Sequence, residues 1–285
     1  MALPAVFVPV AILAGVGLFF AALIALAHRK FKVWEDPRID AVSDLLPGAN
    51  CGACGEAGCR AFAERVVAGG LQPAACTVMN AEAVAAVAGL LGVAAGEANR
   101  RVARLLCAGG RDVAVQEADY SGLATCKAAS AVAGGGKACV WGCLGLADCV
   151  RVCDFDAIAM NAQDLPVVVP DRCTACGDCV DACPKDLFML MPVEHRLIVQ
   201  CKSWLEGDAV RQICRVACTA CGKCVMDAAP GLIAIRDGLA VIDYEQNELA
   251  SPAATARCPT GAIVWVEGAQ FQSPQAADIP EMVVV

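Results

Sequence analysis

The sequence predicts an α+β protein in three parts: a single N-terminal transmembrane helix, a small domain organised around four cysteines, and tandem modules that also depend on cysteine loops. Three observations lead to this fold class. A long uncharged stretch opens the chain, and its 285 residues include 20 cysteines. The cysteines stand in tight groups whose spacing recurs along the second half of the chain.

Composition narrows the possible partners and ligands. The formal net charge is −8 and the pI is near 4.8, whereas a nucleic-acid-binding domain needs clustered lysine and arginine. Nucleic acid is therefore excluded as a partner. Only two histidines are present, His28 and His195, so metal ligation has to rest almost entirely on thiolates. Thiolates select zinc, cuprous copper or iron–sulfur clusters.

Residues 1–30 are predicted to be a transmembrane anchor. Leu3 to Ala27 form a run of 25 uncharged residues, about 37 Å long as a helix against a hydrocarbon core of about 30 Å. A cleaved signal peptide is the alternative, because "ALA" at 25–27 mimics a cleavage site. Against it, no positive charge precedes the run, which exceeds the usual length of roughly 7 to 15 residues. The basic cluster "HRKFK" at 28–32 then places the soluble part on the cytoplasmic side of the inner membrane.

Residues 31–80 are predicted to form a small four-cysteine domain. Its first three cysteines lie on a glycine-rich loop whose backbone can wrap a cluster and donate N–H bonds to its sulfurs. Cysteines two residues apart hold their sulfurs around one centre, which suits a [4Fe–4S] cluster better than a disulfide. The expected ligands are Cys51, Cys54, Cys59 and Cys76.

A helical connector is predicted over residues 81–136. The alanine-rich stretch 80–106 has few helix breakers and reads as helix, interrupted near Gly92 or Gly96. We interpret its apolar positions as packing surface, since nothing in them favours a partner-binding face.

The plainest chemical motif lies in the next module, residues 137–195. The spacing C-x2-C-x2-C-x3-C-P at 173–184 is that of bacterial two-cluster ferredoxins, in which the fourth cysteine ligates the neighbouring cluster. Zinc modules instead set two cysteine pairs well apart. Two [4Fe–4S] clusters are therefore expected. We assign Cys173, Cys176, Cys179 and Cys153 to one, and Cys139, Cys143, Cys149 and Cys183 to the other.

Residues 196–268 are predicted to be a degenerate ferredoxin-like copy that keeps one cluster. The cysteine triplet at 218–224 repeats the motif, but Ala228 stands where a fourth cysteine would fall, and the loop 246–257 has none. The missing cysteines would all have been ligands of one and the same cluster. The remaining set is Cys218, Cys221, Cys224 and Cys258. A remnant without cofactor is the alternative. Four [4Fe–4S] clusters are thus predicted for the whole chain.

Short strands are expected beside the cysteine loops. The segments 153–160, 183–190 and 258–265 each run from a cysteine through a turn into an apolar strand, and "LPVVVPDRC" and "GLAVIDYEQ" supply strands that lead into loops. Each unit has little core of its own. Its metal is therefore expected to nucleate folding.

Four cysteines and the C-terminal tail stay outside these sets. The cysteines belong to no close triplet, so we interpret them as inert buried thiols, with a disulfide or zinc pair and a fifth cluster as alternatives. They are Cys107, Cys126, Cys201 and Cys214. The tail, residues 269–285, has no chemical motif and is predicted to be a mobile or docking extension.

Three stretches carry a resemblance to a known family. "EDPRIDAVSDLLPGANCGACGEAGCRAFA" resembles the cluster-binding domain near the N-terminus of the B subunit of the Rnf (Rsx) electron-transport complex. "GCLGLADCVRVCDFDAI" and "DRCTACGDCVDACP" are similar to the ferredoxin segment of that family, and the order of parts matches over nearly all of residues 1–265. Longer members carry a further two-cluster module, so the loss at 246–257 puts in doubt the number of clusters downstream.

The resemblance implies an electron-transfer subunit of an ion-translocating ferredoxin:NAD+ oxidoreductase. Such a subunit takes electrons from soluble reduced ferredoxin and passes them through other membrane subunits toward NAD+, while Na+ or H+ crosses the membrane. The chain itself has no substrate site, because it lacks a G-x-G-x-x-G motif after a strand, a phosphate loop and a C-x-x-C-H haem site. A membrane-tethered polyferredoxin serving a hydrogenase or corrinoid system is one alternative, and a zinc-binding scaffold is another.

One basic segment is a candidate surface for the ferredoxin. Residues 195–224 carry a local excess of positive charge in an acidic chain, which can steer an acidic protein. An ordinary solvated face is the alternative. The basic residues are Arg196, Lys202, Arg211, Arg215 and Lys223, against Glu206 and Asp208.

Overall fold

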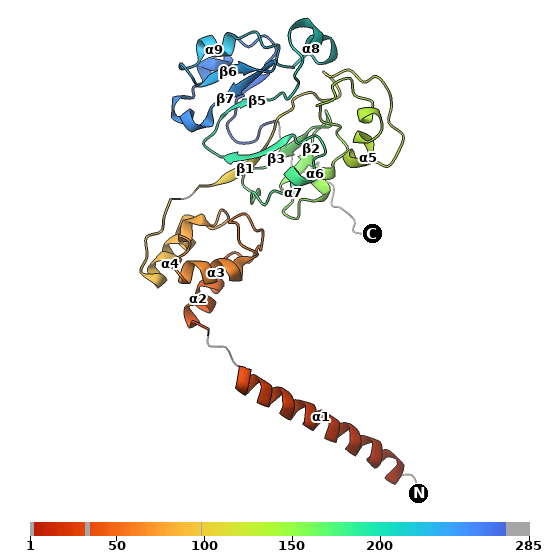
Figure 1. Ribbon diagram of the computed structural model, residues 1–285, viewed down its shortest axis with the longest axis vertical. Helices are drawn as coiled ribbons and strands as arrows, with labels where there is room; N and C mark the ends of the chain where they lie inside the picture. Colours follow the sequence, from red (N-terminus) through yellow and green to blue (C-terminus); the bar gives the residue numbers. More distant parts are fainter. Residues whose placement is uncertain (1–2, 32–34, 98, 272–285) are drawn as a thin grey trace.

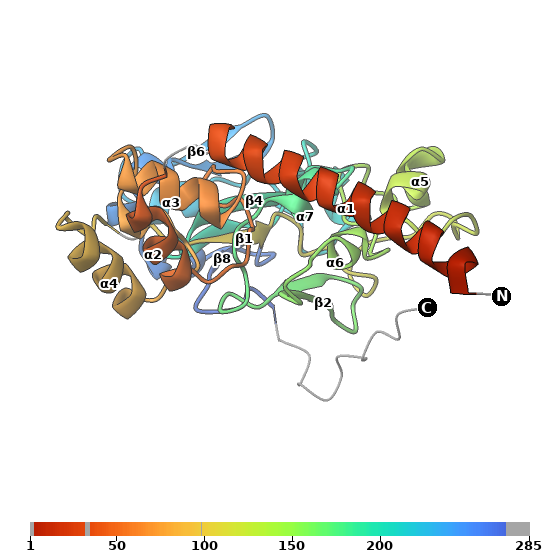
Figure 2. The same ribbon diagram turned by 90° about the horizontal axis from the view of Figure 1, so that it is seen from below.

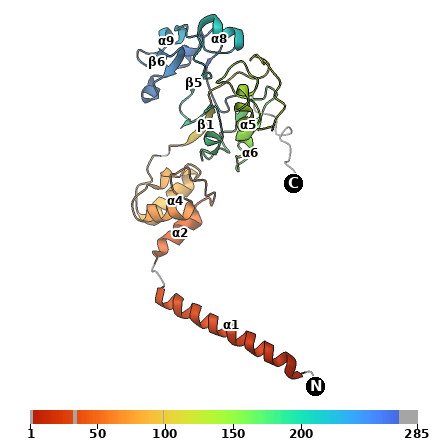
Figure 3. The same ribbon diagram turned by 45° about the vertical axis from the view of Figure 1, so that its right-hand side comes forward.

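The structure is a computed structural model that describes residues 3–31, 35–97 and 99–271. Along its long axis the described parts follow the order of the sequence (Figures 1 and 3): an isolated helix, a small helical domain, and two units of short strands and helices. The predicted fold class is confirmed. One N-terminal apolar helix precedes a cysteine-containing helical domain and two mixed units that repeat one topology.

Helix α1 (Leu3–Phe31) is long and apolar enough to cross a membrane over Val10–Phe31. Its apolar side chains from Val10 onward are exposed on every face. A helix that is apolar all round needs an apolar surrounding, which a bilayer supplies. Basic residues His28, Arg29 and Lys30 occupy its last turn, and Lys32 of the predicted basic cluster lies outside the described residues.

The four-cysteine domain is a bundle of three short helices (Figure 2). They are α2 (Pro37–Leu45), α3 (Cys59–Val67) and α4 (Ala81–Leu91), with the 3-10 turn η1 (Pro73–Ala75) between the last two. The starts of α2 and α4 are capped by side chains, because Asp36 and Asn80 accept hydrogen bonds from backbone N–H groups two and three residues ahead. The buried core comprises Val42, Leu46, Phe62, Ala63, Val66 and Val87, against which Cys54, Cys59 and Cys76 pack.

The helix prediction for residues 80–106 is confirmed at its start and wrong at its end. Helix α4 ends at Leu91, where Gly92 adopts a left-handed φ of 65° that closes the helix. The last residues form strand β1 (Arg101–Leu105), which pairs with a distant strand instead. Helix propensity is a weak preference, and pairing with a partner strand that buries four of the five residues overrides it here.

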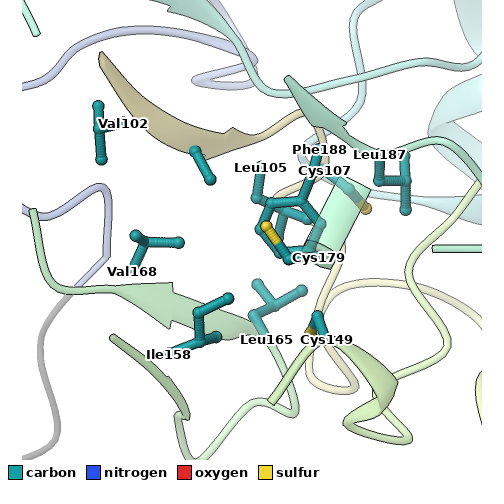
Figure 4. Close-up of a cluster of buried hydrophobic side chains, with 11 residues drawn as sticks. Val102, Leu105, Cys107, Cys149, Ile158, Leu165, Val168, Cys179, Leu187 and Phe188 are labelled. Atoms are coloured by element: carbon teal, nitrogen blue, oxygen red, sulfur yellow. The ribbon is translucent and has the colours of Figure 1, made fainter. Parts of the chain in front are cut away.

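The first ferredoxin-like unit is two antiparallel pairs of strands. Outer strand β1 pairs with β4 (Phe188–Pro192), and β2 (Ile158–Met160) pairs with β3 (Pro166–Val168). The predicted strands after Cys153 and Cys183 are therefore confirmed. Short helices lie between the strands: α5 (Cys126–Ser130), η2 (Ala133–Gly135), α6 (Asp148–Arg151) and α7 (Asp178–Asp181). Its core mixes aliphatic side chains with the thiols of Cys107, Cys149 and Cys179 (Figure 4).

The second unit repeats this topology. Outer strands β5 (Leu197–Val199) and β8 (Ile263–Trp265) pair, and β6 (Ile233–Arg236) pairs with β7 (Leu239–Ile242). The strand predictions at 239–242 and 263–265 are confirmed. Its helices are α8 (Gly207–Ile213), α9 (Lys223–Asp227), η3 (Tyr244–Leu249) and η4 (Pro252–Thr255).

Small side chains fill the place of the missing second cluster in this unit. The cysteine-free loop 246–257 folds into η3 and η4, and η4 packs against α9. Ala228, which replaces the fourth cysteine of the motif, packs in the same core as Ala250 and the fully buried Ala254. Methyl groups therefore occupy space that the first unit leaves for a cofactor.

A stacking contact joins the units, and two hydrogen bonds fix the start of the tail. The ring of His195, between the units, stacks on Tyr244 with centroids 4.8 Å apart. Gln270 accepts from the backbone N–H of Leu105 at 2.9 Å, and Arg104 donates to the carbonyl of Gly268 at 2.7 Å. Residues 268–271 thus dock onto β1, and the rest of the predicted tail, 272–285, lies outside the described residues.

Candidate metal centres

Four cavities of similar size are each lined by four cysteines. Their empty space is about 320 to 380 Å³, part of it open to solvent. All twenty cysteines are free thiols. With the four cysteines of the N-terminal domain, these cavities account for every cysteine of the chain.

The inner site is lined by Cys153, Cys173, Cys176 and Cys179. The structure thus brings Cys153 across to the triplet, as the ferredoxin motif predicts. Burial raises the pKa of Cys179 to about 12. Such a thiol keeps its proton at neutral pH unless a metal displaces it, and metal coordination deprotonates a thiol outright.

The middle site is lined by Cys126, Cys143, Cys149 and Cys183. Cys183 lines this cavity as predicted, whereas Cys139, predicted here, lines another cavity and Cys126 lines this one. Helix α5 begins at Cys126, and the backbone N–H of Lys127 donates to the Asp148 carboxylate at 2.9 Å, which holds α5 against α6. Burial raises the pKa of Cys143 to about 12.

Local spacing could not reveal Cys126 as a candidate ligand. It lies far upstream of the other cysteines of its site and belongs to no short motif. The sequence offered one signal, the number of cysteines. Without Cys139 the middle site has three thiols, so one of the unassigned cysteines had to supply the fourth.

The distal site is lined by Cys218, Cys221, Cys224 and Cys258, the predicted set. Burial raises the pKa of Cys224 to about 11. Burial also acts on Cys258, but the backbone N–H groups of Ile263 and Thr260 outweigh it, so the pKa of Cys258 ends below its ordinary value. Such N–H groups also donate to sulfur ligands of bound clusters and tune them.

The proximal site consists of Cys51, Cys54, Cys59 and Cys76 in the N-terminal domain. The Asn50 side chain closes the loop by accepting from the N–H of Cys59 at 2.9 Å. Burial raises the pKa of Cys76, and the neighbouring thiols of Cys54 and Cys51 add to the effect. Cys51, Cys54 and Cys76 are therefore close enough to interact electrostatically.

The last cavity, the bridging site, is lined by Cys107, Cys139, Cys201 and Cys214. Sequence spacing placed Cys139 at the middle site and interpreted the other three as inert thiols. The structure gathers all four around about 340 Å³ of space. Two of them come from each ferredoxin-like unit or its flank, so only the assembled fold brings them together.

These thiol sets fit a cluster better than a single ion. Among the described residues, no group of three or more Cys, His, Asp or Glu side chains is close enough to bind one metal ion. A four-iron cluster holds its cysteines further apart, around its corners. The cavity walls are almost entirely apolar. Such walls disfavour a hydrated ion.

Two buried hydrogen-bond donors at or near the inner site have no acceptor. The Thr174 hydroxyl, on the cavity wall, is buried without a hydrogen-bond partner. The Nε of Arg104, a residue 1% exposed, also lacks one, and burial lowers the pKa of this guanidinium while Cys173 offsets part of the shift. An anionic cluster would supply negative charge and sulfur acceptors for the Thr174 hydroxyl and the Arg104 Nε–H, which have no hydrogen-bond partner.

Comparisons with known proteins agree with this chemistry. Residues 46–78 match the family described as "Putative Fe-S cluster", and residues 166–188 match "4Fe-4S binding domain". The first range includes all four proximal cysteines, and the second includes the cysteines 173–183. The sites in these ranges are therefore iron–sulfur sites.

Relatives cover most of the chain. The chain is 43% identical over 244 residues (86% of this chain, 73% of the relative) to the B subunit of the Na(+)-translocating ferredoxin:NAD(+) oxidoreductase complex of Acetobacterium woodii. It is 39% identical over 260 residues (90% and 92%) to the B subunit of the proton-translocating ferredoxin:NAD(+) oxidoreductase complex of Clostridium ljungdahlii. It is 37% identical over 254 residues (89% and 96%) to the B subunit of an ion-translocating oxidoreductase complex of Methanosarcina acetivorans.

Proposed function

The chain belongs to the family of B subunits of ion-translocating ferredoxin:NAD+ oxidoreductase (Rnf) complexes, and on that premise we propose that it carries electrons from reduced ferredoxin toward the membrane subunits that reduce NAD+. An iron–sulfur role in electron transfer follows from the family and the domain matches. The donor, the direction of flow and the coupling to Na+ or H+ are the proposed part.

The observation that carries the proposal is the serial placement of the thiol sets. Thr77, next to Cys76 of the proximal site, donates to the carbonyl of Thr174 on the inner cavity wall at 2.9 Å. Cys149 of the middle site and Cys179 of the inner site belong to one packed core (Figure 4). Bound clusters supply one-electron carriers at each of these places. The residues of the chain therefore define a route that begins next to the membrane anchor.

The distal site lies at the other end of this route, where a soluble donor can approach. Cys221 is exposed, unlike the other nineteen cysteines. Helix α8 begins beside the site, since the N–H of Gly207 donates to the carbonyl of Thr219 at 3.1 Å. Arg211 on α8 and Lys223 on α9 add positive charge near this opening. We propose that the acidic ferredoxin docks here.

The basic side chains of the predicted segment differ in how strongly other groups of the protein hold them. Arg215 donates to the backbone carbonyl of Asp112, and Lys202 to that of Asp186 at 2.6 Å, so both side chains are held by hydrogen bonds to the backbone. Arg196 lies near Glu267 at 3.4 Å. Arg211 meets only the exposed Asp208, at 3.9 Å, an ion pair of little strength. Arg211 is therefore the better test of steering.

Arg211→Glu is expected to slow electron uptake from reduced ferredoxin by about tenfold at low ionic strength. The effect should shrink as salt is added, because screening removes long-range steering. Stopped-flow reduction of the anaerobic full-length chain measures this rate. Arg65→Glu makes the same charge change in the four-cysteine domain and should leave the rate unchanged. Equal rates for Arg211→Glu and the unmodified chain at low salt would remove the docking proposal.

The membrane end of the route delivers electrons to other subunits. Helix α1 carries no ionisable residue between Leu3 and Ala27, whereas ion pathways through membranes are marked by charged side chains. We therefore assign the transport of Na+ or H+ to the partner subunits. The basic last turn of α1 supports a cytoplasmic position for the soluble domains under the positive-inside rule.

The anchor predicts an uncleaved N-terminus. Mass spectrometry of the membrane-extracted protein should recover peptides from Leu3 to Ala27, and protease added to inverted vesicles should digest the soluble domains. A mature N-terminus at His28, as cleavage after "ALA" would leave, contradicts the anchor. Protection of the soluble domains in inverted vesicles contradicts the proposed side.

A further inference from the structure

Cys107, Cys139, Cys201 and Cys214 line the bridging site, and we propose that it binds a fifth [4Fe–4S] cluster. The thiols meet in one small space. A Cβ built on Gly109 would lie 3.2 Å from the Cys214 sulfur and 3.6 Å from the Cys107 sulfur. The pKa values of Cys139 and Cys214 are raised by burial first and then by the neighbouring Cys107.

The dimensions of the site match those of its neighbours. Its empty space of about 340 Å³ falls within the 320 to 380 Å³ range of the inner, middle and distal sites. Each of the four cavities is lined by four cysteines and almost no polar surface. Its thiols are free and, like those of the other described sites, not close enough to share one ion. Equal ligand number and equal space point to the same ligand.

Backbone hydrogen bonds hold together the segments that form the bridging site. Residues 113–115 run antiparallel to 213–215, with Val115 N–H donating to Ile213 at 2.9 Å and Arg215 N–H to Val113 at 3.0 Å. Ala114 and Cys214 form a β-bridge across this pair. Cys107 follows β1 and Cys201 follows β5, so rigid elements of both units hold the thiols.

A buried lysine complements the charge of the proposed ligand. Lys137 is 7% exposed, lines the cavity, and donates its ammonium to the carbonyls of Gly109 and Cys143. Its positive charge also acts on Cys139 and Cys214, whose thiolates it stabilises. Within the described residues no carboxylate pairs with Lys137. Four thiolates around a cluster give a net negative charge, which accounts for a buried cation without a carboxylate.

The position of the site gives it a role in the relay. The Cys143 N–H of the middle site donates to the Cys107 sulfur at 3.4 Å. On the other side, burial raises the pKa of Cys201 to about 11, while the backbone N–H of Cys218 at the distal site stabilises its thiolate. The bridging site thus touches the middle and distal sites and lies between them. A cluster here connects the two ferredoxin-like units, and it goes beyond the four sites proposed above.

Iron counting and thiol mapping on the full-length chain test this proposal. The anaerobically assembled chain should contain about twenty irons and as many sulfides, four for each of five clusters. Alkylation of the native protein, followed by release of the metal and a second, isotopically distinct alkylation, should show all four bridging thiols protected. This mapping needs no variant and so does not depend on a variant folding.

Variants assign the irons to the site. Cys107→Ala and Cys214→Ala should each lose about four irons, and the double variant no more than either single one. Ser203→Ala removes a hydroxyl from the same cavity wall and should lose none. About sixteen irons with the four bridging thiols alkylated, or zinc or a disulfide at these thiols, overturns the fifth cluster and leaves the proposed relay standing. Absence of iron from every site overturns the proposed function instead.

Discussion

Removing the iron from the full-length chain is expected to unfold both ferredoxin-like units while α1 stays helical. Each unit holds only two-stranded sheets, and helices α5, α6, α7 and α9 have four or five residues. Isolated two-stranded pairs and single helical turns are marginal in water. The cysteines stand inside the apolar cores, so the ligand occupies the place of core side chains.

An empty site removes the packing partner of the side chains that surround it, and the loss of those contacts destabilises the fold. The whole stability of a domain is about 5–15 kcal/mol. Because the pKa values of Cys143 and Cys179 are raised to about 12, the apo thiols stay neutral. Loss of packing and not charge repulsion drives the unfolding.

Hydrogen–deuterium exchange of the detergent-solubilised protein, before and after anaerobic chelation, measures this effect. Amides of β1 to β8 should lose their protection together with the visible absorption of the clusters. The amides of α1 serve as the internal control, because that helix contains no cysteine. Retention of protection in β4 and β8 after complete loss of iron would show that the cores hold without metal.

Cys179→Ala is expected to reduce ferredoxin-driven NAD+ reduction by the assembled complex more than about 100-fold. Substitutions that only support a metal ligand already cost about 10–100-fold, and Cys179 lines the inner site itself. The inner site lies between the proximal and middle sites, so no other thiol set replaces it. Reduction of the distal end by ferredoxin should remain fast, because that end keeps its own cysteines.

Val180→Ala is the matched control for Cys179→Ala. Val180 packs partly buried against the same core, next in sequence, but has no thiol. It should keep at least half of the activity and all of the iron. Near-normal NAD+ reduction by a Cys179→Ala complex, with one cluster missing, would mean that electrons bypass the inner site.

Spacing motifs predicted what short stretches of chain determine by themselves. The triplets at 173–179 and 218–224 and the crossing of Cys153 and Cys183 follow from local loops, and the structure places these cysteines together. The strands next to the cysteine loops also follow from local apolar runs. That α1 is long and apolar enough to cross a membrane also follows from composition and length alone.

Long-range contacts account for what the sequence did not predict. Cys107 follows β1, Cys201 follows β5 and Cys214 follows α8, and these three thiols line one cavity although no spacing rule links them. Cys126, the first residue of α5, lines the middle cavity, whereas Cys139 lines the bridging cavity. Strand β1 forms in an alanine-rich context because β4 offers it a partner. Tertiary pairing, not local preference, decides all three.

The docking of Gln270 on β1 belongs to the same class. Its side chain accepts from and donates to the backbone of Leu105, at 2.9 and 2.5 Å, as a further strand residue would. No motif in the tail marks this residue. The predicted boundary at 268 therefore separates a few residues from the core that they help to close.

The central claim is that this chain holds a continuous series of iron–sulfur clusters between its exposed end and the membrane. The most direct measurement is EPR spectroscopy of the anaerobically purified, fully reduced full-length chain. The account predicts signals of reduced [4Fe–4S] clusters, broadened by interaction between neighbours, that integrate to about five spins per chain. A colourless, EPR-silent protein, or signals from clusters that do not interact, would contradict it.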